Sequence, residues 1–178
     1  MRYFFTVLAC LALLSAQAQI KEGDTFPQIS GENLNDAAID IPATNGKETI
    51  VLIAYTADAQ KGSKLWAKEL YANFIDPNSM SSGLYDVNVY YVYLFGGIKK
   101  AAFGKIKKRV KPETDADLYD HVVLAETSSG FYKEELAFKD KNQPNIFLIN
   151  EYGKIAWHGY GRYTSQKLDK LMDAIGGE

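Results

Sequence analysis

"IVLIAYTADAQKGSKLWAKEL" (residues 50–70) joins an apolar run to a short polar stretch and then to an amphipathic segment. The run from Ile50 to Ala54 is unbroken and rich in β-branched residues, which is typical of a strand covered on both faces in a parallel sheet. Ser63 is a candidate N-cap for a helix that runs to about Phe74. Its expected buried side consists of Leu65, Trp66, Leu70 and Phe74. We therefore predict a strand, a polar loop over residues 59–62, and a helix.

The rest of the chain continues this alternation of strands and helices. Further strands are predicted at residues 39–42, 88–95, 121–125, 145–150 and 154–159, and further helices at residues 98–111, 130–138 and 165–175. Asn45-Gly46 suits a tight hairpin turn, and residues 151–153 are too few for anything but a hairpin. The pattern predicts an α/β fold whose mixed sheet is parallel in its first part, antiparallel at its end, and covered by helices on both faces.

The first eighteen residues differ from the remainder. Arg2 precedes an apolar run over residues 3–14, and Ser15-Ala16-Gln17-Ala18 has the small-x-small pattern of a secretory cleavage site. We expect a signal peptide over residues 1–18 and one domain over residues 19–178, located in the periplasm or secreted. The apolar run is too short to anchor the mature chain in a bilayer. A lipoprotein acylated at Cys10 is the alternative, although it would cut the apolar run in its middle.

Cysteine usage excludes several activities. Cys10 is the only cysteine and would leave with the signal peptide, so the mature chain has no thiol. Thiol-disulfide exchange, thiol peroxidase activity and a cysteine metal site all require a thiolate and are not expected. His121 and His158 show no arrangement with other catalytic residues, and the run Asp115, Asp117, Asp120 lacks the glycine and glutamate of a calcium loop. We expect no cofactor and no metal.

Charge is unevenly distributed. Without Arg2, 19 basic residues face 22 acidic ones, a net charge of −3. One segment nevertheless holds seven cations and no acid, namely Lys99, Lys100, Lys105, Lys107, Lys108, Arg109 and Lys111. This basic helix is either a docking face for an acidic partner or anionic lipid, or a solvated surface whose other side packs on the core through Ile98, Ala102, Ile106 and Val110. No nucleic-acid partner is expected.

Three motifs carry a resemblance to a known fold. They are "GDTFP" at residues 23–27, the unit at residues 50–70, and Gln143-Pro144 followed by "NIFLINEYGKIAWHG". Across residues 23–175 their order resembles the redoxin form of the thioredoxin fold. The resemblance implies a three-layer sandwich and a cis peptide bond before Pro144. It also implies that Ala59, Gln60, Lys61 and Gly62 stand where a redoxin has Cys-x-x-Cys.

The same resemblance implies a groove that accepts an extended peptide, formed where the first helix begins beside the Pro144 loop. Its candidate residues are Asp58, Ala59, Gln60, Lys61, Gly62, Ser63, Gln143 and Pro144. A helix N-terminus at Gly62 and Ser63 would add free backbone N–H groups that favour an anion. Trp66 is expected in the core. Tyr152, Tyr160 and Tyr163 should cluster near the last hairpin, where with Arg162 they have the composition of a binding surface.

A narrower resemblance concerns "YKEELAFKDKNQPNIFLINEYGKIAWHGYGRYTSQKLDKL" (residues 132–171). It is similar to a family of mitochondrial ATP synthase assembly factors that have a thioredoxin-like fold without redox cysteines. Ile155, Trp157 and Gly161 match the family pattern, whereas Ala156 replaces its basic residue. The resemblance implies a cysteine-free binding scaffold and leaves the partner open.

Two functions from different classes follow. The first is a secreted, non-catalytic thioredoxin-like module that binds a protein or peptide in the degenerate active-site groove, in assembly or as a chaperone. The second is a non-thiol enzyme or a binding protein for small anions that uses Asp58, Lys61 or a histidine in the same groove. No catalytic residue is assigned, and an enzyme is the less expected outcome.

Overall fold

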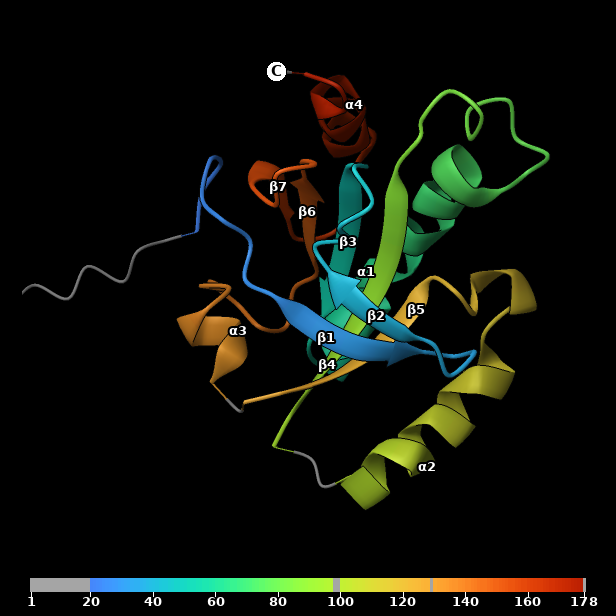
Figure 1. Ribbon diagram of the computed structural model, residues 1–178, viewed down its shortest axis with the longest axis vertical. Helices are drawn as coiled ribbons and strands as arrows, with labels where there is room; N and C mark the ends of the chain where they lie inside the picture. The colour runs from blue at the N-terminus through green and yellow to red at the C-terminus, as the bar shows by residue number, and fades with distance from the viewer. Residues whose placement is uncertain (1–19, 98–99, 129, 178) are drawn as a thin grey trace, which may run out of the picture.

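The computed structural model describes residues 20–97, 100–128 and 130–177. A seven-stranded mixed sheet forms its centre, in the order β2-β1-β5-β4-β3-β6-β7 (Figure 1). The strands are β1 (Ile29–Asn33), β2 (Ala38–Ile41), β3 (Thr49–Ala54), β4 (Asn88–Gly96), β5 (Val122–Thr127), β6 (Asn145–Ile149) and β7 (Ile155–Tyr160). The predicted signal peptide, with Cys10, lies outside the described residues.

Strands β3, β4 and β5 are parallel and form the middle of the sheet. Every residue of β3 is buried, as the unbroken apolar run predicted. The hairpin β6–β7 joins β3 antiparallel, and the hairpin β1–β2 joins β5 antiparallel on the other side. The mixed sheet and its antiparallel end are therefore confirmed, whereas strand β1 was missed.

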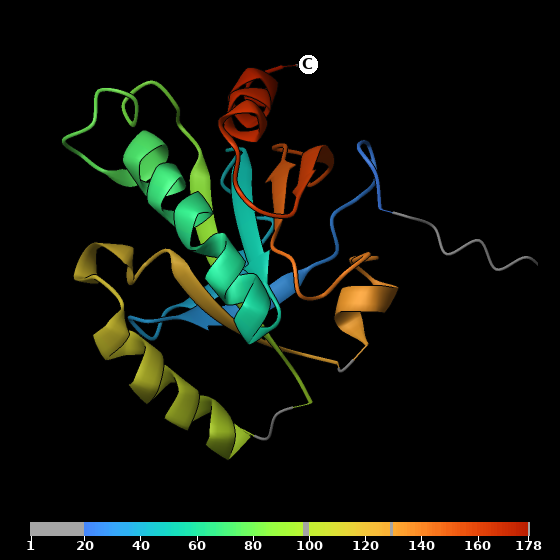
Figure 2. The same cartoon turned by 180° about the vertical axis from the view of Figure 1, so that it is seen from behind.

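Two apolar cores lie on the two faces of the sheet. One face packs Trp66 and Leu70 of α1 (Ala57–Leu70) together with Leu168 and Leu171 of α4 (Ser165–Ala174); Figure 2 shows α1 lying in front of the sheet. The other face is covered by the chain before β1 and by the short helix α3 (Phe131–Glu134) with the loop that follows it. Helices on both faces confirm the predicted three-layer α/β sandwich.

Helix α1 begins at Ala57, six residues before Ser63. It continues into a π-helical segment, η1 (Tyr71–Ile75), and ends at Asp76. Residues 59–62, predicted as a loop, are therefore helical. Three of the four residues predicted on the buried side are buried, but Leu65 is 48% exposed because it faces away from the sheet.

Two further expectations were wrong. Gly46 has the positive φ of +75° that the Asn-Gly pair indicated, but the strands on either side of it do not pair, because β2 pairs with β1 and β3 with β4 and β6. The helix predicted over residues 130–138 is only α3, because the chain turns at Ala137, where φ is +47°.

Helix α2 (Lys100–Val110) lies at the margin of the molecule (Figures 1 and 2). It leads through η2 (Lys111–Glu113) and η3 (Ala116–Leu118) into β5. None of the side chains described in α2 is fully buried. Phe103 and Val110 pack at the edge of the α1-side core. Within the described residues, no helix has the length and apolar character needed to cross a membrane.

Candidate functional site

A groove lies where α1 begins, between that helix and two loops. Its volume is about 600 Å³, within the range common for ligand pockets. Helix α1, the loop before β6 and the loop after β7 each supply part of the lining, which consists of Asp58, Lys61, Gly62, Lys64, Leu65, Asn142, Gln143, Arg162 and Tyr163. The start of α1 and the Pro144 loop therefore lie side by side.

Thr56 fixes both the start of α1 and its distance from the Pro144 loop. Its hydroxyl oxygen accepts a hydrogen bond from the N–H of Ala59 (3.3 Å), which is the usual role of an N-cap threonine. The same hydroxyl lies 3.1 Å from the side-chain oxygen of Asn142, to which it donates. The helix N-terminus is thus at residues 56–59, so Gly62 and Ser63 do not present free N–H groups, contrary to the prediction.

Gly62 allows α1 to approach Pro144 closely. A Cβ atom at this position would stand 3.2 Å from Cδ of Pro144, which is tighter than ordinary van der Waals contact. Pro144 itself is buried. The cis bond implied by the redoxin resemblance was wrong, since the only cis peptide in the described ranges precedes Pro42, and Gln143–Pro144 has the trans form that most X–Pro bonds adopt.

The loop after β7 is held from three sides. The N–H of Gly161 donates to the carbonyl of Pro144 (2.9 Å). The carbonyl of Gly161 accepts from the indole N–H of buried Trp66 (3.1 Å). Nζ of Lys167 donates to the carbonyls of Tyr160 and Arg162. Trp66 is therefore a core residue, as expected, that also supports the groove from below. This wall is a fixed backbone that carries the side chain of Arg162.

Several side chains that line the groove are exposed. Asp58 and Lys61 form an ion pair at 3.6 Å, and their side chains are 72% and 77% exposed. Leu65 is one of the exposed large apolar residues, and the ring of Tyr163 packs edge-on against Trp66. Burial, with Glu69 and Asp169, raises the pKa of the Tyr163 hydroxyl. The enzymatic alternative predicts that Asp58 and Lys61 converge in a concave pocket. Both line the groove and pair with each other, but the exposure of both side chains to solvent counts against this alternative.

The predicted groove residues fall into two sets. Asp58, Lys61, Gly62 and Gln143 line the groove. The other four, Ala59, Gln60, Ser63 and Pro144, do not line it. Ala59, Ser63 and Pro144 are buried and Gln60 is half-buried; Ala59 and Ser63 lie on the side of α1 that faces the sheet, and Ser63 donates to the carbonyl of Gln60. Asn142, Lys64 and Leu65 were missed as groove residues. Thr56 was missed as the N-cap that positions α1, although the pair Thr56 and Asp58 is a recognisable helix-start signal.

Neither histidine reaches the groove. The ring of His158 stacks on Phe147 with centroids 4.3 Å apart, and its Nε2 lies 3.1 Å from the side-chain oxygen of Asn145. Burial, assisted by Lys139, lowers the pKa of His158 to about 4. Nδ1 of His121 lies 2.9 Å from the carbonyl oxygen of Val89. His158 is therefore a packing residue of the edge strand β7, and His121, directly before β5, is bound to β4.

A β-bulge changes the faces of β7. Leu148 pairs with Trp157 and Ile149 with Ile155, so Ala156 is an extra residue in the strand. Ala156 and Trp157 both pack on the α1-side core, whereas strict strand alternation would place Ala156 on the same face as His158. The expected tyrosine cluster was also wrong in part: Tyr160 and Tyr163 lie at the groove end of β7, but Tyr152 lies in the turn at its opposite end.

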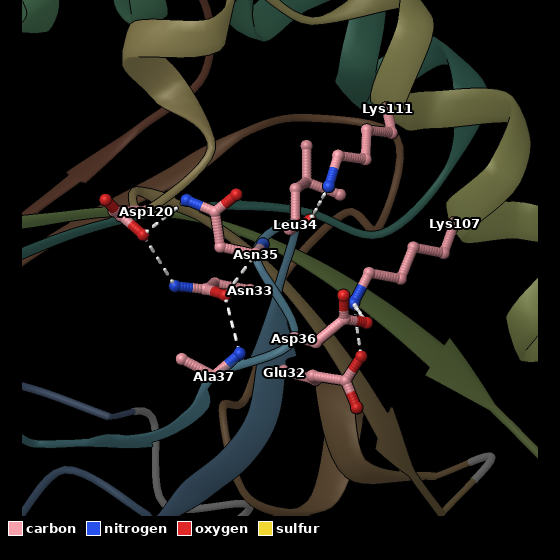
Figure 3. Close-up of polar contacts among 9 residues, drawn as sticks. All are labelled: Glu32, Asn33, Leu34, Asn35, Asp36, Ala37, Lys107, Lys111 and Asp120. Atoms are coloured by element: carbon pink, nitrogen blue, oxygen red, sulfur yellow. Dashed lines mark hydrogen bonds and ion pairs between the residues drawn. The ribbon is translucent and has the colours of Figure 1, made fainter.

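The cations of the basic helix are of two kinds, those bound to other parts of the fold and those exposed to solvent. Lys107 binds the carboxylates of Glu32 and Asp36, and Nζ of Lys111 donates to the carbonyl of Leu34 (2.7 Å). Figure 3 shows both lysines reaching the β1–β2 turn. These contacts tie α2 to the sheet, and the hydrogen bond and charge of Lys107 lower the pKa of Asp36. Lys105, Lys108 and Arg109 are exposed; Lys99 and the side chain of Lys100 lie outside the described part.

The β1–β2 turn is also held from the β5 side. Buried Asn33 accepts from the N–H groups of Asn35 and Ala37 (both 2.9 Å), and its amide donates to Asp120 (3.1 Å). Asn35 donates to the same carboxylate (2.8 Å), as Figure 3 shows. This network leaves Asp120 engaged within the fold. In the described ranges, no group of three or more histidine, cysteine, aspartate or glutamate side chains is placed to hold a metal ion.

Comparison with known proteins gives a family and a fold. The family model described as ATP10 protein matches residues 14–177. The exposed lipoprotein thioredoxin of Streptococcus pneumoniae is 14% identical, with a TM-score of 0.55 over 84% of this chain and 100% of that one. The thioredoxin domain of a thiol-disulfide oxidoreductase from Bacteroides vulgatus is 12% identical, with a TM-score of 0.56 over 88% and 99%. Among the curated proteins, none matches. The thioredoxin-like fold is confirmed.

Proposed function

The chain belongs to the ATP10 protein family, and from this premise we propose that it is a non-catalytic thioredoxin-like assembly module that binds a protein segment in the groove at the start of α1. The resemblance of residues 132–171 to ATP synthase assembly factors, confirmed by a family match over nearly the whole chain, supports an assembly role. The redoxin-like position of the groove supports its use for an extended peptide.

One observation carries the proposal. The groove keeps the architecture of a redoxin site, with α1 and the Pro144 loop in contact through Gly62, while its lining has no cysteine and no histidine. A site without a thiol cannot exchange disulfides. The exposed, mixed polar and apolar lining instead suits recognition of a partner.

The experiment blocks the groove with bulky side chains and follows the partner. Asp58→Trp with Lys61→Trp fills the groove from two exposed positions, so the fold is preserved. Asp169→Trp with Lys170→Trp, at exposed positions of α4, is the matched control. Proteins cross-linked to each variant in the native host are identified by mass spectrometry. We expect the dominant partner to be lost from the groove variant and retained by the control; retention by both contradicts the proposal.

We also propose that the protein acts after export, because residues 1–18 have the pattern of a signal peptide. Its mature form would begin at Gln19. Intact-mass measurement of the protein from its native host tests this point. A mass that includes Met1 and the apolar run contradicts it, and a lipid-modified N-terminus supports the lipoprotein alternative.

A further inference from the structure

Two cations of the groove are not neutralised by the protein. Lys64 and Arg162 both line it, and in the described part of the chain neither makes an ion pair. Lys61 differs, because Asp58 faces it at 3.6 Å. The groove therefore has an excess of positive charge, although the chain as a whole is acidic.

Each free cation stands next to an apolar surface. Lys64 precedes Leu65, whose side chain is 48% exposed, and Arg162 precedes Tyr163, whose ring is held against Trp66 at a centroid distance of 5.2 Å. The two cations come from different walls of the groove, α1 and the loop after β7, and the apolar side chains of Leu65 and Tyr163 line the same groove. This lining suits a ligand that carries two acidic groups and an apolar one.

The loop before β6 supplies polar groups suited to a peptide backbone. The side-chain amide of Gln143 lines the groove and makes no hydrogen bond to the described residues. An amide offers both a donor and an acceptor, which is what an extended peptide requires. The backbone around it is fixed, since Gly161 binds Pro144 and Thr56 binds Asn142, so little ordering entropy is lost when a ligand binds.

We infer that the groove takes an extended peptide segment with acidic side chains on both sides of an apolar one, the acids meeting Lys64 and Arg162 and the apolar group covering Leu65. This inference rests on the proposed function and names the class of segment that it binds. The selectivity is electrostatic at an open site, so it weakens as salt shortens the range of the interaction.

The test uses defined peptides and the purified protein. The probe is a blocked pentapeptide of the order glutamate, glycine, leucine, glycine, glutamate, whose three side chains project from one face of an extended chain. The matched peptides carry glutamine or lysine in place of both glutamates, and free glutamate is a further arm. Binding is followed by NMR shifts of the backbone amides of Leu65 and Tyr163. Two exposed ion pairs predict about fivefold tighter binding of the glutamate than the glutamine peptide at low salt, and a smaller ratio at 0.5 M salt.

Protein variants assign the selectivity to the two cations. Lys64→Gln with Arg162→Gln should abolish the preference for glutamate over glutamine, while Lys68→Gln with Lys170→Gln, two exposed cations outside the groove, should leave it unchanged. All four positions are exposed, so folding is not at risk.

Equal binding of the glutamate and glutamine peptides, or stronger binding of the lysine peptide, overturns the charge inference and leaves the proposed peptide-binding function standing. Equal shifts with free glutamate also overturn it, because the groove is then an anion site. If no peptide shifts these amides, the inference is wrong, and the proposed function then depends on the cross-linking result alone.

Discussion

Protonation of His158 should limit the stability of this protein in mild acid. In the folded chain the ring is stacked on Phe147 and bound to Asn145. The Asn145 amide nitrogen donates to the carbonyl of Gln143 (3.2 Å), so its oxygen faces His158 and the neutral ring carries its proton on Nε2. Burial lowers the pKa of His158 from 6.5 to about 4.

The direction of the effect follows from proton binding. Between the two pKa values the unfolded chain binds more protons than the folded one. The contribution of His158 to the free energy of unfolding is therefore fully present above pH 6.5 and is lost as the pH falls towards 4. For pKa values of 6.5 and about 4, the loss between pH 7.5 and pH 5 is about 2 kcal/mol.

The assay compares urea unfolding of the wild type with His158→Gln at pH 7.5 and pH 5. The other titratable groups are the same in both proteins. The free energy of unfolding of the wild type should therefore fall by about 2 kcal/mol more than that of the variant between pH 7.5 and pH 5. His121→Gln, which leaves His158 and its neighbours in place, is the matched control for the replacement of a histidine. NMR titration of the His158 ring should give a midpoint well below 6. Equal losses in the wild type and His158→Gln, or a ring midpoint near 6.5, would refute the reasoning.

Three other predictions concern the scaffold and are measured by urea or thermal unfolding. Trp66→Phe removes the hydrogen bond to the Gly161 carbonyl and leaves that carbonyl buried without a partner, so the free energy of unfolding should fall by about 1–3 kcal/mol. An unchanged stability would mean that this hydrogen bond does not support the loop after β7. Gly31→Ala places a methyl group 2.6 Å from a β5 carbonyl oxygen and should destabilise by about 1–3 kcal/mol, whereas Gly104→Ala, with open space in α2, should stabilise by about 0.5–1 kcal/mol. Lys107→Ala should lower the Tm because Lys107 ties α2 to the β1–β2 turn, while Lys108→Ala should not; equal Tm values would mean that the ion pairs contribute nothing.

The centre of the fold was predictable because its signals are local. The unbroken apolar run in β3 shows that both faces of that strand are covered, and the sheet position next to β4 follows from the strand and helix order. The helix start was missed for a local reason as well. Ser63 has the residue type of an N-cap, but Thr56 stands earlier and is followed by Asp58 in the first turn.

Other features depend on contacts between distant residues. Lys107 binds carboxylates more than 70 residues earlier in the chain. Helical periodicity therefore could not distinguish Lys107, which binds within the fold, from the exposed cations of α2. The bulge at Ala156 depends on how β7 pairs with β6, which is invisible in either strand alone. Arg162 was recognised by residue type, but its position beside α1 required the contact between Gly161 and Trp66.

The most direct test of the groove is site-specific photo-cross-linking in the native host. A photoreactive benzoylphenylalanine is placed either at Leu65, which is 48% exposed in the groove, or at Tyr152, which is 77% exposed at the opposite end of β7. We expect one dominant protein adduct from position 65 and none of that adduct from position 152. The same adduct from both positions, or no adduct from position 65, would contradict partner binding in the groove.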